Sequence, residues 1–260
     1  MGLPPVIIND IKLEPKSELH RRKLEALRRF VERLLSSPVR GDIAKIILFG
    51  SALDGKVGEE SDVDLLVFGA RNLAAVDEAC TDASFEVGLE TMESLEPLVY
   101  GLSDLYVPDS YFIFTALRNG KEIYSMEERE LIRKAAENHF LLATEYLEAA
   151  ERSRADGHLR VAIDAAYNAA ELCAKGFLLG KVKKMPTGHG ATIRLFSDLY
   201  IKTEALPTKL GRRLNRSLEL RNKARYEYEA VITEDMAEET IELAKSMLDH
   251  LKNYILEELR

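Results

Sequence analysis

The chain has 260 residues, of which 46% are hydrophobic and 31% are charged, and its formal net charge is −8. This composition is too apolar for a disordered protein, and the length suffices for two domains that each bury a core. No apolar run approaches the roughly 20 residues that span a bilayer, and the first residues lack the pattern of a signal peptide. Cys80 and Cys173 have no spaced partners that would indicate a zinc site or a disulfide framework. We therefore expect a cytoplasmic protein without a membrane segment.

The charge is distributed unevenly along the chain. Residues 1–125 contain 14 basic and 21 acidic residues, so this part should repel nucleic acid. Residues 181–225 contain 12 basic and 3 acidic residues. The second region is therefore a candidate face for anions, and RNA is the partner to consider there.

The first half of the chain alternates between helix and strand patterns. An apolar stripe at helical spacing predicts an amphipathic helix over residues 17–35 that packs one face on a sheet. The patterns then predict, in chain order, a strand at 46–49, a strand at 65–68, a helix at 73–90, a strand at 95–100, a helix at 109–118 and a strand at 122–124. These elements predict a small mixed α/β domain over residues 1–125.

Two of these strands carry side chains suited to phosphate and metal. The first strand breaks into a loop at Gly50 and Ser51, where backbone N–H groups and a hydroxyl can meet phosphate oxygens. Ten residues further on, Asp62 and Asp64 lead into the next strand, and the period of two places both carboxylates on one face. Hard cations such as Mg²⁺ or Mn²⁺ bind such oxygens together with substrate phosphates. The pattern therefore predicts nucleotidyl transfer.

This stretch resembles the minimal nucleotidyltransferases of the DNA polymerase beta superfamily. Their pattern is an apolar residue, Gly, Gly or Ser, a spacer of about ten residues, and Asp-x-Asp or Asp-x-Glu. Phe49, Gly50, Ser51, Asp62 and Asp64 match it. The resemblance implies a triphosphate held at Gly50 and Ser51, with ATP the expected substrate, and a two-metal Mg²⁺ site at the two aspartates.

One position departs from the family pattern. Members commonly have a basic residue three places after the Ser, where this chain has Asp54, and Lys56 is the nearest basic residue. Lys56 is therefore the candidate for phosphate binding. The departure leaves open a second interpretation, in which the chain is a nucleotide-binding or regulatory module with negligible turnover.

Members of the family also use a third carboxylate on a later strand, and Glu96 is the candidate here. Its strand contains Pro97, which confines it to a sheet edge or a strand start. Glu86 and Glu90 are the rivals, but their spacing is typical of a solvated helix face.

After residue 125 the pattern is helical only. Helices are predicted at about 127–155, 158–179, 191–200, 210–226 and 234–259. The second is rich in alanine, which allows helix axes to approach closely. We expect an α+β protein in which residues 126–260 form an up-and-down helical bundle.

Part of this bundle resembles the HEPN (higher eukaryotes and prokaryotes nucleotide-binding) domains. Within its motif segment, which contains Arg221, Asn222, Tyr226 and Tyr228, the residues that match are Arg221 and Tyr228. Ribonuclease members have a His where this chain has Tyr226, and a phenol cannot replace imidazole as a base near neutral pH. His189 lies in a different loop and is not assigned that role. A structural role, in which Arg221, Asn222 and Arg225 cap helices and pair across them, is the favoured interpretation of these residues.

The two resemblances together imply the leading function and its alternatives. The leading hypothesis is an Mg²⁺-dependent transfer of AMP from ATP to a hydroxyl of a protein or small molecule, with the bundle as the acceptor-binding or regulatory partner. In toxin–antitoxin pairs of this type, a HEPN tyrosine is the acceptor, which makes Tyr228 a candidate. The alternatives are the regulatory module, RNA binding or cleavage through residues 181–225, and an aminoglycoside-type transferase. HEPN domains commonly dimerise, so a homodimer is expected.

Overall fold

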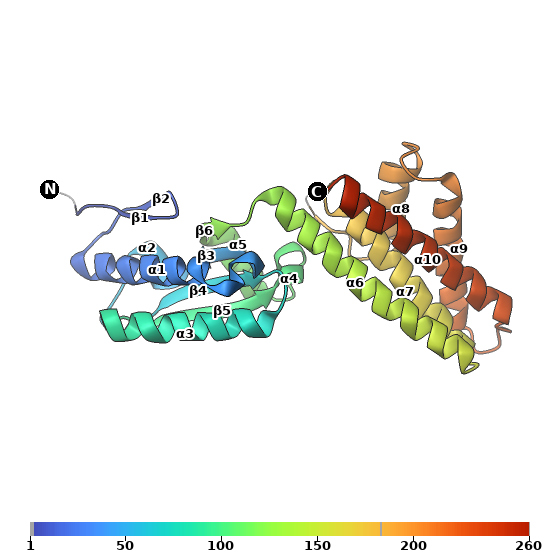
Figure 1. Ribbon diagram of the computed structural model, residues 1–260, viewed down its shortest axis with the longest axis horizontal. Coiled ribbons are helices and arrows are strands. Elements are labelled where there is room, and N and C mark those ends of the chain that lie inside the picture. Colours follow the sequence, from blue (N-terminus) through green and yellow to red (C-terminus); the bar gives the residue numbers. More distant parts are fainter. Residues whose placement is uncertain (1–2, 183, 260) are drawn as a thin grey trace. The chain divides into compact units, whose positions relative to one another are not determined.

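The computed structural model describes residues 3–182 and 184–259, and the chain divides into two compact units. The first unit ends at Leu131 and the second begins at Ile132 (Figure 1). Together they confirm the predicted α+β class, because the first contains a mixed sheet with helices and the second contains helices. In the described ranges, no helix combines the length and apolar character that crossing a membrane requires.

The centre of the first unit is a four-stranded sheet with strand order β5-β4-β3-β6. The strands are β3 Ile43–Leu48, β4 Val63–Gly69, β5 Leu95–Gly101 and β6 Lys121–Ser125. β4 and β5 run parallel, which requires a crossover, and helix α3 (Leu73–Thr91) supplies it. The other two pairs are antiparallel. β5 is an edge strand, which is one of the two positions to which Pro97 confines it.

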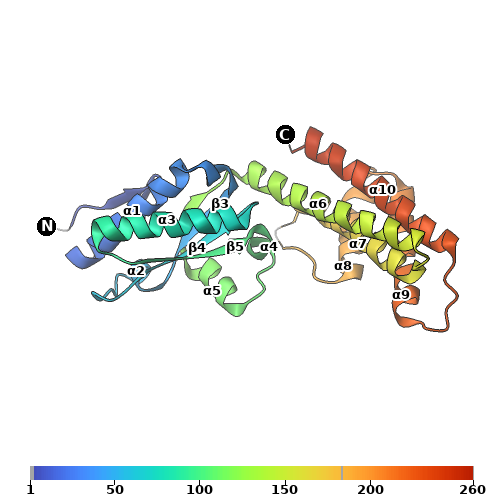
Figure 2. The same cartoon turned by 60° about the horizontal axis from the view of Figure 1, so that its bottom comes forward.

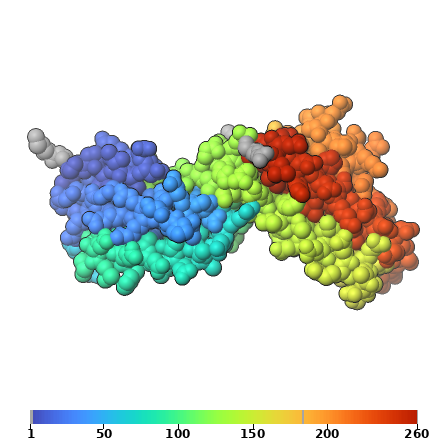
Figure 3. Space-filling model, in the orientation of Figure 1, coloured from blue at the N-terminus to red at the C-terminus, as the bar shows by residue number. Residues whose placement is uncertain are grey.

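One face of the sheet is covered by α1 (Glu18–Ser36) and α3, which lie side by side (Figures 2 and 3). Ser17 begins α1 by accepting a hydrogen bond from the His20 N–H group (3.1 Å). Alternate residues of β4 and the apolar stripe of α1 form the shared core, which includes Leu24, Leu27, Phe30, Val31, Val63, Leu65 and Val67. The period of two therefore directs the intervening residues of β4 to the opposite face.

α5 (Tyr111–Asn119) lies on the opposite face of the sheet, and two short helices follow the ends of β3 and β5 (Figure 2). α2 (Gly50–Asp54) directly follows β3, and α4 (Leu102–Tyr106) directly follows β5. The sequence predicted a loop after β3, and this expectation was wrong. Gly50 turns the chain with a positive φ of 70°, after which the backbone closes one helical turn that ends at Gly55 (φ 68°).

The sequence reading missed a hairpin at the N-terminus. β1 (Val6–Ile8) and β2 (Ile11–Leu13) pair through Asn9 and Asp10, which both have positive φ. Two such residues between apolar runs are the signature of a two-residue hairpin turn, so the signal was present.

The second unit consists of helices, as predicted. They are α6 Glu128–Ala155, whose first four residues belong to the first unit, α7 Leu159–Leu178, α8 His189–Phe196, α9 Thr208–Tyr226 and α10 Glu234–Glu257, with a π-helical turn at Ser197–Ile201 after α8. α7 is buried on most of its surface, because its alanines let α9 and α10 pack closely. Phe177, Tyr200 and Tyr254 form an aromatic cluster, within which the Tyr200 hydroxyl donates to the Phe177 backbone oxygen (2.6 Å).

Candidate active site

Two neighbouring strands bring carboxylates to one end of the sheet. Asp64 in β4 pairs with Glu96 in β5 in parallel register, so their side chains share a face. Asp62 stands two residues before Asp64, at the start of the same extended segment. The Phe49 N–H group donates to the Asp64 backbone oxygen (3.1 Å), which brings Gly50 beside the carboxylates. The three predicted acids and the Gly-Ser pair therefore gather at one place.

Gly50 packs directly against Asp64. Its φ of 70° lies in the left-handed region, and a Cβ atom added there would lie 2.9 Å from the Asp64 Cγ atom and overlap a carboxylate oxygen. Glycine is thus needed at this position for two independent reasons.

The three carboxylates affect one another electrostatically. Burial raises the pKa of Asp64 above its ordinary value, and the negative charges of Glu96 and Asp62 raise it further. Several like charges concentrated at one end of a sheet favour a bound cation, which would offset their repulsion.

The chemistry of this donor set fits a divalent cation. Carboxylate oxygens are the ligands that Mg²⁺ and Mn²⁺ prefer, and Asp62, Asp64 and Glu96 supply them from adjoining strands. As the side chains are placed in residues 3–182 and 184–259, no three His, Cys, Asp or Glu groups are close enough to hold one ion together. A shared ion therefore requires changes of side-chain rotamer at these positions.

Ser51 and Lys56 lie on the same side of the site. Both line a cavity with Gly50, and the Lys56 N–H group donates to the Ser51 backbone oxygen (3.1 Å). The Lys56 side chain is exposed, and no ion pair joins it to any residue that the structure describes. Its ammonium is therefore available to an anion.

Helix α1 holds α2 in position through a buried histidine. The Lys16 N–H group donates to Nδ1 of His20 (3.1 Å), so Nε2 carries the ring proton and donates it to the Ala52 backbone oxygen (2.7 Å). Because Ala52 belongs to α2, this bond ties the Gly50–Ser51 turn to the first turn of α1.

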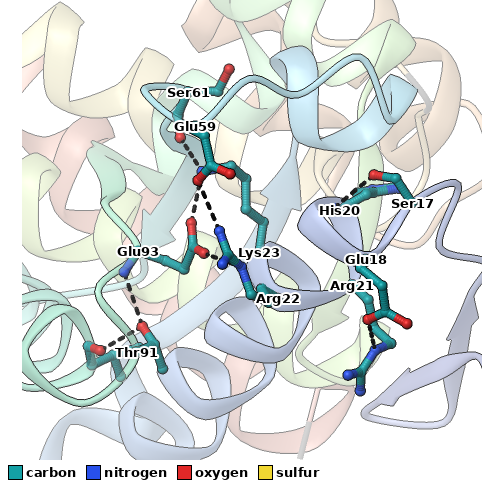
Figure 4. Close-up of polar contacts among 11 residues, drawn as sticks. Ser17, Glu18, His20, Arg21, Arg22, Lys23, Glu59, Ser61, Thr91 and Glu93 are labelled. Carbon is teal, nitrogen blue, oxygen red and sulfur yellow. Dashed lines mark hydrogen bonds and ion pairs between the residues drawn. The ribbon is translucent and has the colours of Figure 1, made fainter.

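A second support from α1 is Lys23, only 1% of which is exposed (Figure 4). Its Nζ atom donates to the Ser61 backbone oxygen (2.5 Å) and to Oε2 of buried Glu93 (2.7 Å). Arg22 also contacts Glu93, through Nε (3.1 Å). Ser61 precedes Asp62, and Glu93 lies three residues before Glu96. One buried ammonium thus links the segments that lead into both carboxylate strands, and the sequence reading missed it.

In the second unit, the predicted Arg221 is a buried residue between α7 and α9. It is 6% exposed, its Nε atom donates to Oδ1 of Asp164 (3.0 Å), and its guanidinium lies over the rings of Tyr167 and Tyr226 (5.9 and 5.7 Å to the centroids). Its Nη1 atom donates to Oδ1 of Asn222 (3.3 Å). These contacts are those of a residue that joins two helices.

His189 belongs to a polar cluster in the same unit. Its Nδ1 atom lies 2.7 Å from Oε1 of buried Glu171, which also accepts a hydrogen bond from the Tyr167 hydroxyl (3.4 Å). The sequence reading missed Glu171 because it lies within the alanine-rich helix. Tyr228 is separate from this cluster, 87% exposed, and its hydroxyl donates to Glu229 (3.1 Å).

In comparisons with known proteins, two family models match separate parts of the chain. Residues 35–129 match the family model described as "Polymerase beta, Nucleotidyltransferase", and residues 136–254 match the HEPN domain model. A protein of Methanocaldococcus jannaschii, named "Putative protein adenylyltransferase MJ0604", is 42% identical over 65 residues. That alignment covers 25% of this chain and 64% of the relative, so the chain spans less than two thirds of it.

A solved structure was also matched. It is spectinomycin adenyltransferase AAD(9) from Enterococcus faecialis, crystallised with ATP and spectinomycin, at 12% identity over 88% of this chain and 98% of that one. Its TM-score of 0.29 is too low to establish a shared fold.

Substitution of Gly50 by alanine tests the close contact with Asp64. We expect Gly50→Ala to lower the free energy of unfolding by about 1–3 kcal/mol, because the new Cβ atom is strained at positive φ and displaces the carboxylate. Urea denaturation measures the change. Gly58→Ala is the matched control, because its Cβ atom would meet only Ser61 Oγ at 3.6 Å. Equal stability of both variants would contradict the contact.

Substitution of Lys23 tests the buried ion pair. We expect Lys23→Met to lower the free energy of unfolding by about 3 kcal/mol, because Glu93 then stays buried with a single cationic partner. The double variant Lys23→Met/Glu93→Leu should recover much of that loss, and urea denaturation of both variants measures the difference. Lys12→Met, whose partner Glu14 is exposed, should change stability by less than about 0.5 kcal/mol.

The raised pKa of Asp64 predicts a pH-dependent stability of the metal-free protein. A carboxyl whose pKa is raised on folding binds its proton more tightly in the folded state, so it costs stability at neutral pH and ceases to do so in acid. Asp64→Asn should therefore raise the melting temperature at pH 7 in the presence of a chelator. The gain should shrink as the pH falls from the raised pKa of Asp64 to the ordinary aspartate pKa, and a gain independent of pH would contradict this origin.

Proposed function

We propose that the chain transfers AMP from ATP to a hydroxyl group, because residues 35–129 match the polymerase beta nucleotidyltransferase model and residues 136–254 match the HEPN model. The observation that carries the proposal is the register of Asp64 beside Glu96, with Asp62 and Gly50 next to them. Family membership makes the reaction class nucleotidyl transfer, and the donor set supports Mg²⁺ as its metal.

Each site residue has a proposed task. Asp62 and Asp64 hold the metal, and Glu96 completes the ligand set from the neighbouring strand. Backbone N–H groups at Gly50 and the hydroxyl of Ser51 bind the triphosphate, and Lys56 adds a positive charge. When bound, the metal would assist loss of the acceptor hydroxyl's proton and neutralise charge on the departing pyrophosphate.

The acceptor is proposed to be a protein or a small molecule, with the HEPN domain as its binding or regulatory partner. The name of the archaeal relative, a protein adenylyltransferase, favours a protein. Within this chain Tyr228 is the more exposed of the two motif tyrosines, at 87% against 68% for Tyr226, so it is the first acceptor to examine, in the chain itself or in a second copy. We place the protein in the cytoplasm, because Cys80 and Cys173 are both free and buried.

The test is incubation of the protein with α-labelled ATP and Mg²⁺ or Mn²⁺, followed by a search for label on protein, RNA and added small acceptors. We expect label on protein, and none with Asp62→Ala/Asp64→Ala, because the metal ligands are lost. Asp77→Asn, an exposed acid on α3, is the control and should transfer as the unaltered chain does. Tyr228→Phe decides whether that phenol receives the label.

Other outcomes identify the other functions. ATP binding without any label would contradict transfer and indicate a regulatory module. Label on an aminoglycoside alone would indicate a small-molecule transferase. Label on RNA alone would contradict the protein acceptor. RNA binding that weakens strongly with salt would then implicate the basic 181–225 region.

A further inference from the structure

A cavity of about 370 Å³ lies between α2 and α5 in the first unit. From the α2 side it is lined by Gly50 and Ser51, the residues proposed to bind the triphosphate, together with Leu53 and Lys56. From the α5 side it is lined by Phe112, Thr115, Ala116 and Asn119. Its size lies within the range of small-molecule sites, and it adjoins the phosphate-binding turn.

The cavity has an aromatic wall that is open to solvent. Phe112 is 43% exposed, and its ring packs edge-to-face on Phe49, with centroids 5.5 Å apart and an interplanar angle of 77°. Phe49 is the residue directly before Gly50, so the ring is held next to the phosphate-binding turn. An exposed ring fixed in this way offers a flat apolar surface on which a heteroaromatic base can stack.

The same wall carries an unpaired amide. Asn119, the last residue of α5, is exposed, and its side chain makes no hydrogen bond within residues 3–182 and 184–259. An amide offers a donor and an acceptor side by side. Adenine presents the complementary pair, an amine and a ring nitrogen, and asparagine recognises that pair in nucleic acids. Guanine has a carbonyl in place of the amine.

We infer that this cavity binds the base of the nucleotide, with Phe112 as the stacking surface and Asn119 as the group that selects adenine. The inference rests on the proposed function, because Gly50 and Ser51 line both the cavity and the proposed triphosphate site. A base in the cavity is therefore adjacent to phosphates on the turn. Asp54 contributes a negative charge and Lys56 a positive charge to the cavity lining. The net charge of the lining is therefore close to zero, which suits an uncharged base.

The test is calorimetric titration with a non-hydrolysable ATP analogue in Mg²⁺, which needs no turnover. Phe112→Ala should raise the Kd about 10-fold, the loss expected for one aromatic stacking contact, while Phe112→Trp should keep the affinity. Inorganic tripolyphosphate, which has no base, should bind both variants equally. Phe114→Ala is the matched control, because this ring on the same helix is 49% exposed and does not line the cavity.

Selection is tested by comparing ATP and GTP analogues. Asn119→Ala should bring the two Kd values together, and 8-azido-ATP should label peptides of α2 or α5 on irradiation. An unchanged Kd in Phe112→Ala, with tight binding by the unaltered chain, would overturn the inference and leave the proposed function standing. Failure of the unaltered chain to bind any triphosphate would instead reject the proposed function, and the base site with it. Circular dichroism of each variant establishes that it is folded.

Discussion

The buried Lys23 ammonium is the interaction on which the geometry of the site depends. It is held 2.5 Å from the Ser61 backbone oxygen and 2.7 Å from Glu93, with almost no exposure to water. A buried ammonium is costly unless paired, so the chain segments that supply its partners are fixed relative to α1. Those segments lead directly into Asp62 and Glu96. His20, one turn earlier on the same helix face, fixes α2 in the same way, so α1 supports both halves of the site.

This support matters because the site concentrates like charges. Asp64 is half-buried beside Glu96 and Asp62, and its raised pKa records the cost of ionising it there. The Asp64 carboxylate packs directly against Gly50, and it fits there only because Gly50 has no Cβ atom. Paired backbone and a buried ion pair hold these groups in place, and the proposed function would have a bound cation offset their repulsion.

Much of the fold could be predicted because its signals are local. The apolar stripe of α1, the strands beside Gly50 and Asp64, and the helices of the second unit are periodic patterns. The sequence predicted that Glu96 lies on a strand at an edge or a strand start, but it did not predict that this strand pairs in parallel with the strand of Asp64. The Lys23–Glu93 pair was missed because its members are 70 residues apart, although Lys23 and His20 both fall on the buried stripe of α1. The ion pair of Arg221 with Asp164 was likewise not predicted from the sequence, because only the packing of α7 on α9 brings the two side chains together.

The proposed function requires that Asp62, Asp64 and the Gly50–Ser51 turn form a metal–triphosphate site. The most direct measurement is electron paramagnetic resonance of Mn²⁺ titrated into the protein with a non-hydrolysable ATP analogue. We expect protein-bound Mn²⁺ whose binding depends on the nucleotide and is lost in Asp62→Ala/Asp64→Ala. Equal Mn²⁺ binding by the unaltered chain and that variant would contradict this expectation, because these carboxylates would then hold no metal.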